Sequence, residues 1–140
     1  MTMSYINSII LFLFLFVQTT PSIGLQNIGV VRIDDGTYGG HRVFIVQNES
    51  IVRNNKNLRH YLNLLKHKIA LVYPDWESDW NASIFTKKEF VGYKDEDKNL
   101  PYVVSGEWEK SYIAEYSKEQ NVCTIYPLNP KKQLKLKISE

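Results

Sequence analysis

The hydrophobic positions of the chain follow two different periods, and the change between them predicts the order of the elements. Residues 27–33 and 41–47 are rich in Val and Ile, and turn residues that include Gly36, Gly39 and Gly40 separate them. Runs of β-branched residues bounded by Gly and Asp are typical of strands. We therefore expect two strands joined by a long loop, in a spacing that suits an antiparallel hairpin.

A helical period follows these two strands. Apolar side chains recur at steps of three and four residues, at Leu58, Tyr61, Leu62, Leu65 and Ile69. This spacing places them on one stripe of an amphipathic helix. The sequence predicts this helix at about residues 56–67, and it leaves the apolar run 70–73, just before Pro74, as a candidate start of a strand.

Strand-like patterns fill the remainder of the chain, in residues 83–93, 101–105, 107–116, 121–126 and 133–139. In the last of these, apolar side chains alternate with Lys135 and Lys137, which predicts a half-buried strand at an edge of the sheet because edge lysines discourage further pairing. The fold class that follows is α+β: one amphipathic helix packed on a largely antiparallel sheet of about five to seven strands.

The first 24 residues are predicted to be a signal peptide. Residues 9–17 form an uninterrupted apolar run that is shorter than the roughly 20 residues of a membrane-spanning helix. Its length suits the apolar core of an export signal, and small residues favour cleavage after Ser22 or Gly24. We expect residues 25–140 to form a single secreted, extracellular domain with no membrane span in the mature protein.

Export makes two Asn-x-Ser sequons relevant, Asn48-Glu49-Ser50 and Asn81-Ala82-Ser83. Neither has Pro at its middle position, so both fit the acceptor pattern for N-glycosylation. The sequons fall in polar stretches, and we expect both to lie on surface loops. The sequence therefore predicts a glycoprotein modified at Asn48 and Asn81.

The chain has a single cysteine, Cys123, so no disulfide can form within it. The surrounding residues 122–126 are β-prone, which predicts a buried thiol in a strand. An odd cysteine in an exported protein also leaves open an intermolecular disulfide and a homodimer through Cys123.

Charge and histidine spacing predict neither a nucleic-acid partner nor a metal site. Lys and Arg number 17 against 15 Asp and Glu, a formal net charge of +2 that does not favour nucleic acid. The three histidines, His41, His60 and His67, lack metal-ligand spacing, so we expect no metal and no cofactor. The basic C-terminal segment, with Lys131, Lys132, Lys135 and Lys137, is either the solvated face of a strand or a contact for heparan sulfate or another anionic surface.

One segment, residues 75–80, combines carboxylates with tryptophans. Asp75, Glu77 and Asp79 alternate with residues that include Trp76 and Trp80, and aromatic platforms beside carboxylates are typical of sites that bind or cleave sugars. Trp76 and Trp80 are thus candidate ligand-contact aromatics. The same segment also reads as a surface loop fixed by two partly buried tryptophans.

The leading functional hypothesis is a secreted, N-glycosylated binding protein that acts on an extracellular protein or glycan of a host or a neighbouring cell. Its basis is the export signal, the sequons and the many aromatic residues, while the chain carries no nucleophile elbow or other catalytic signature. The alternative is a small secreted hydrolase acting on glycan or nucleic acid, with Asp75, Glu77, Asp79 or His60 as acid/base groups. The sequence favours the binding protein over the enzyme.

Overall fold

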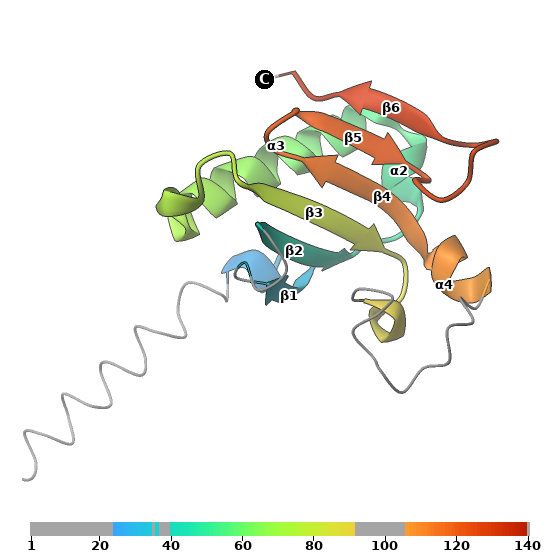
Figure 1. The fold of residues 1–140 in the computed structure, drawn as a ribbon, viewed down its shortest axis with the longest axis horizontal. Helices are drawn as coiled ribbons and strands as arrows, with labels where there is room; N and C mark the ends of the chain where they lie inside the picture. The colour runs from blue at the N-terminus through green and yellow to red at the C-terminus, as the bar shows by residue number, and fades with distance from the viewer. Residues whose placement is uncertain (1–23, 35, 37–39, 92–105, 140) are drawn as a thin grey trace, which may run out of the picture.

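The computed structural model describes residues 24–34, 36, 40–91 and 106–139, which form a six-stranded sheet with a long helix on one face (Figure 1). The strands are β1 (Val30–Asp34), β2 (His41–Val46), β3 (Trp80–Phe85), β4 (Tyr112–Ser117), β5 (Val122–Ile125) and β6 (Leu134–Lys137). The helices are α2 (Ser50–Arg53), α3 (Asn55–Val72) and α4 (Gly106–Ser111), with single 3-10 turns η1 (Pro74–Trp76) and η2 (Lys88–Phe90).

The strands lie side by side in chain order, from β1 at one edge to β6 at the other. All neighbours pair antiparallel except β2 and β3, which are parallel. The parallel pair requires a crossover, and α3 is that crossover. The predicted α+β class and mostly antiparallel sheet are confirmed. The expectation of a single helix is not confirmed, because the helices α2 and α4 accompany α3.

The long helix α3 begins where Asn54 caps it, since the Asn54 Oδ1 accepts the backbone N–H of Asn57 at 3.1 Å. The predicted apolar stripe is buried, from Leu58 to Ile69. Residues 70–72 are helical, so the candidate strand there was wrong. The helix ends only at Tyr73, whose N–H still bonds the Ile69 carbonyl, because Pro74 cannot continue the pattern.

The sheet has two different faces. The face under α3 is apolar: Val43, Ile45, Ala82 and Ile84 from the parallel pair pack with the buried stripe of the helix. Alternation along the strands turns the intervening residues to the opposite face. That face carries both polar and aromatic side chains, namely Arg42, Phe44, Ser83, Phe85, Tyr112 and Glu115.

Two of the predicted strands need correction, and a third lies outside the residues that the structure describes. Residues 107–116 were expected to be one strand, but α4 occupies the first half and β4 the second. The predicted strand 83–93 ends at Phe85, and a bend and η2 follow it. The predicted strand 101–105 and the apolar run 9–17 lie outside the described residues. The edge position of β6 is confirmed, and Lys135 and Lys137 are exposed on it.

In the described part of the chain, no helix combines the length and the apolar character that crossing a membrane requires.

Candidate functional site

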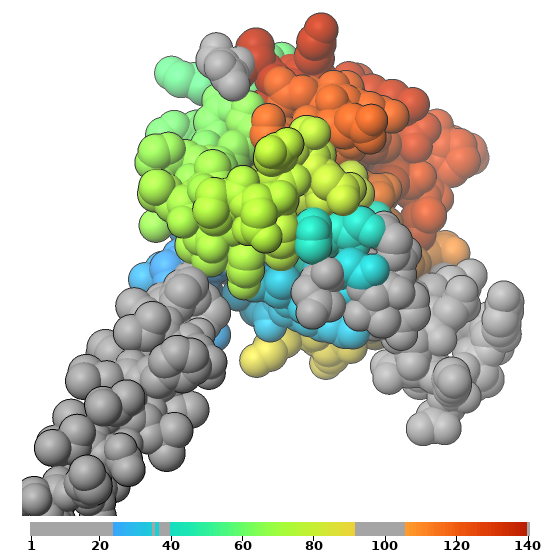
Figure 2. Space-filling model, turned by 60° about the vertical axis from the view of Figure 1, so that its left-hand side comes forward, coloured from blue at the N-terminus to red at the C-terminus, as the bar shows by residue number. Residues whose placement is uncertain are grey.

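The two tryptophans of segment 75–80 belong to the core. Trp76 is 5% exposed and Trp80 is 2% exposed. Trp76 is stacked between His41, at 4.4 Å between ring centroids, and Tyr73, at 4.0 Å. Figure 2 shows the two segments that this stacking joins: the start of β2 lies beside the turn that contains η1. The expectation that Trp76 and Trp80 contact a ligand is therefore corrected: their rings bury apolar area within the domain.

The carboxylates of the same segment face solvent. Asp75, Glu77 and Asp79 are exposed around η1, and His60 is exposed on α3. None of these four lines either of the two cavities described below. Among the described residues, no group of three or more His, Cys, Asp or Glu side chains is placed to hold a metal ion. The residues proposed for a hydrolase are thus not part of these two cavities of the described residues.

The two sequons lie in different surroundings. Asn48 is exposed in the connection between β2 and α2, as expected for a surface loop. Asn81 is half-buried within β3, paired with Arg42 on one side and Ser117 on the other, so its assignment to a loop was wrong. Alternation places the Asn81 side chain on the face opposite α3, because its neighbour Ala82 is in the core under the helix.

The single cysteine is enclosed by the sheet and α3. Cys123 is fully buried, opposite Tyr116 on β4 and Leu136 on β6. Burial in this apolar setting, aided by the charge of Glu115, raises the pKa of the Cys123 thiol to about 12. A buried, protonated thiol cannot reach a second chain, so the folded domain offers no intermolecular disulfide. The possibility of a homodimer through Cys123, which the sequence left open, is therefore contradicted by the burial of this thiol.

Sequence reasoning missed a pair of neighbouring cavities at one end of the sheet. The first, the Tyr126 cavity, has a volume of about 470 Å³. The second, the Asn48 cavity, has a volume of about 540 Å³. Glu49 and Lys110 line both cavities, so the two cavities are neighbours. Both volumes fall within the roughly 300–1,000 Å³ of small-molecule sites.

The cavities lie where the two parallel strands end. Asn48 and Glu49 come just after β2, and Thr86 and Lys87 come just after β3; all four line the Asn48 cavity. Sheets with parallel strands commonly bind ligands outside the carboxyl ends of those strands. This end of the sheet also holds α4 and the start of β4, on the right in Figure 1.

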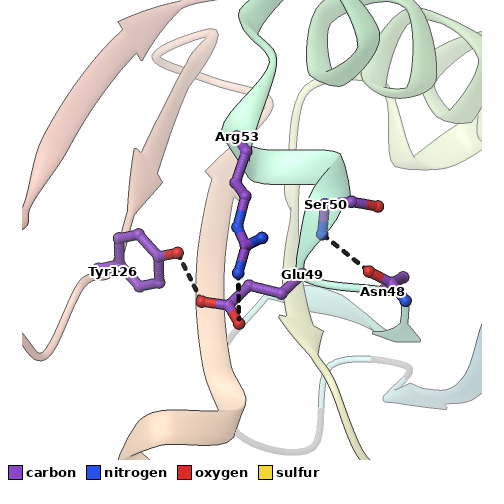
Figure 3. A network of polar contacts seen from close by, with 5 residues as sticks. All are labelled: Asn48, Glu49, Ser50, Arg53 and Tyr126. Atoms are coloured by element: carbon purple, nitrogen blue, oxygen red, sulfur yellow. Dashed lines mark hydrogen bonds and ion pairs between the residues drawn. The ribbon is translucent and has the colours of Figure 1, made fainter.

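Hydrogen bonds fix Glu49, one of the two side chains that the cavities share (Figure 3). The Tyr126 hydroxyl donates to Oε1 of Glu49 at 2.7 Å, and Arg53 donates to Oε2 at 3.5 Å. On the other side of Glu49, the Ser50 N–H donates to Oδ1 of Asn48 at 2.9 Å. Glu49 is therefore held at a defined position by partners from β5's end and from α2.

Tyr126 has an unusual backbone conformation. Its φ is 50°, in the left-handed region that bulky residues rarely adopt. The Tyr126 N–H bonds the Ile113 carbonyl at 2.8 Å, so the residue is tied at both its backbone and its hydroxyl. Burial, together with the hydrogen bond to Glu49 and the charge of that carboxylate, raises the pKa of the Tyr126 phenol. Strain retained in this way is found at functional sites more often than elsewhere.

No local signal in the sequence identifies this site. Glu49 and Tyr126 are 77 positions apart, and nothing in either neighbourhood indicates that they meet. Only the order of the strands brings them together.

Comparisons of the chain with protein-family models, with curated proteins and with solved structures found no match.

Proposed function

We propose that the chain is a secreted, N-glycosylated binding protein whose ligand site is the pair of cavities around Glu49 and Lys110, of which the Tyr126 cavity does not include the glycan acceptor Asn48 in its lining. The observation that carries the proposal is that two neighbouring cavities of ligand size share these two side chains. Their walls combine apolar rings with carboxylates, ammonium groups and hydroxyls, the mixture typical of sites that orient a small or extended ligand.

The start of the described domain is compatible with secretion. Leu25 is 1% exposed and is the first core residue of the described chain. Both predicted cleavage positions, after Ser22 and after Gly24, leave Leu25 in the mature protein. Processing at either position would therefore retain every core residue of the part of the chain that the structure describes.

The remaining sequence-based alternative, a small secreted hydrolase, gains no support from the geometry. Its candidate residues Asp75, Glu77, Asp79 and His60 are exposed and line neither cavity. Within the cavities, Glu49 already accepts bonds from Tyr126 and Arg53, an arrangement that suits a structural carboxylate better than one that exchanges protons.

The test is a binding screen with the secreted, glycosylated protein as bait against extracellular proteins and glycans of host and neighbouring cells. A captured partner is then titrated against the variant Lys110→Gln, which changes both cavities, and against Lys131→Gln, which changes an exposed lysine that lines neither. We expect Lys110→Gln to weaken binding about tenfold, as for loss of one charge-assisted contact, and Lys131→Gln to leave it unchanged. Equal affinity for both variants would place the ligand site elsewhere.

A further inference from the structure

We propose that the Tyr126 cavity binds an acidic saccharide, that is, a sugar that carries a carboxylate. This assignment rests on the proposed function and adds to it the chemical class of the ligand. It is argued from the charges of the cavity, from its apolar wall and from the hydrogen-bonding groups that remain free.

The uncommitted charges of the cavity favour an anion. Lys110 and Lys132 both line it, and neither forms an ion pair with another described residue. The Glu49 carboxylate is matched by Arg53 and by the Tyr126 hydroxyl. The lining thus holds two ammonium groups and two carboxylates, Glu49 and Glu109, and the excess positive charge comes from Arg53, which pairs with Glu49 from outside the lining. A ligand carboxylate would satisfy the excess positive charge and would form charge-assisted hydrogen bonds.

One wall of the cavity is apolar and rigid. Tyr126, Leu128 and Pro130 line it, and the Leu128 side chain is 45% exposed. The Tyr126 ring is fixed by its bond to Glu49 and by its backbone, and the Lys132 Nζ lies 5.8 Å from its centroid. A preorganised ring of this kind loses little freedom on binding, and the face that Lys132 does not cover suits the C–H face of a sugar.

The hydrogen-bonding groups distinguish a sugar from a simple carboxylate. The Asn129 Oδ1 already accepts the backbone N–H groups of Lys131 and Lys132, at 3.2 and 3.3 Å, so the amide N–H groups of this side chain remain as donors for a ligand. Glu109 offers acceptors at the same cavity. A ligand with many hydroxyls uses donors and acceptors together, whereas a ligand with only anionic oxygens would leave Glu109 repelling it. Carboxylate and hydroxyls on one ring describe a uronic or similar acidic sugar.

The experiment is a titration of the secreted, glycosylated protein with glucuronic acid and with glucose, followed by amide chemical shifts at low salt. We expect glucuronic acid to bind about tenfold more tightly than glucose, with shifts centred on Tyr126 and Asn129. Lys132→Gln should reduce the preference to near unity, while the adjacent exposed control Lys131→Gln should keep it. Tyr126→Phe, which keeps the ring but releases Glu49, should weaken both sugars together.

Several results would overturn the assignment. Equal binding of glucose and glucuronic acid, equal effects of Lys131→Gln and Lys132→Gln, or shifts remote from Tyr126 would each do so. If neither sugar binds, the assignment of an acidic saccharide also fails. In that case, a partner from the screen whose affinity depends on Lys110 would still support the proposed ligand site. If neither the sugars nor any screened partner depends on Lys110, the proposed function fails with it. Circular dichroism of each variant establishes that it is folded.

Discussion

The buried thiol of Cys123 makes the stability of the domain sensitive to alkaline pH. Burial raises the pKa of this thiol from an ordinary value of 9.0 to about 12. The folded chain therefore keeps a proton that the unfolded chain releases above pH 9. A group of this kind contributes its full stability below the unfolded pKa, and the contribution is lost as pH rises toward the folded pKa. The variant Cys123→Ala removes this dependence.

The size of the effect follows from the shift. Each pKa unit corresponds to about 1.36 kcal/mol of difference between the two protonation states. At pH 11 the unfolded thiol is ionised and the folded thiol is not, so the contribution of Cys123 has fallen by about 3 kcal/mol relative to pH 7. Burial also raises the pKa of Tyr61 to about 12 and raises the pKa of Tyr112, but both tyrosines remain in Cys123→Ala. The difference between the two proteins thus isolates the thiol.

Urea unfolding followed by circular dichroism at pH 7, 9 and 11 measures the free energy of unfolding of both proteins. Cys123→Ala loses some packing at every pH, so the comparison concerns the slope with pH and not the absolute value. We expect the parent protein to lose about 3 kcal/mol more than the variant between pH 7 and 11. Parallel losses in the two proteins would refute the reasoning, as would rapid labelling of the native thiol by a thiol reagent at pH 8. A cysteine introduced at the exposed position, Lys131→Cys in Cys123→Ala, provides the reactive control.

Two further predictions concern the core and the sequons. Leu62→Ala, at a fully buried position of α3, should lower the free energy of unfolding by about 2–5 kcal/mol, whereas Leu64→Ala, at a position 37% exposed, should change it by less than about 1 kcal/mol in the same urea assay. If both sequons are used, Asn48→Gln and Asn81→Gln should each remove one glycan from the secreted protein, seen as one step in mass; an unchanged mass for either variant would show that its site is unoccupied.

The sequence predicts the helix and most strands because each has a period of its own. The stripe from Leu58 to Ile69 and the β-branched run of β2 needed no tertiary information. The failures occur where tertiary contacts decide. Residues 107–116 read as one strand because Trp108, Tyr112 and Tyr116 fall on one alternating face, yet residues 107–111 are helical, and Trp108 packs against Phe85 and Tyr112. Propensity alone does not settle such a short segment.

The candidate site was less predictable than the fold. Sequence reasoning chose Trp76 and Trp80 because aromatics beside carboxylates suit sugar binding, but composition does not reveal which side of a residue faces the core. The stacking of Trp76 between His41 and Tyr73 joins two separate segments, the turn of residues 73–76 and the start of β2. Conversely, Tyr126 and Glu49 lie in unremarkable sequence, and their meeting depends on how β5 returns past β4.

The direction of β3 accounts for the existence of the site. Because α3 carries the chain back along the sheet, β3 runs parallel to β2 and both end on the same side. The three antiparallel pairings that follow then place the start of β4, the end of β5 and the start of β6 on that side too. Glu49 follows the end of β2, Lys110 comes just before the start of β4, Tyr126 follows the end of β5, and Lys132 comes just before the start of β6. Had a hairpin joined β2 to β3, every later strand would be reversed, and Glu49 would lie at the opposite end of the sheet from the other three. The crossover helix thus does more than bury the core: it determines which residues meet.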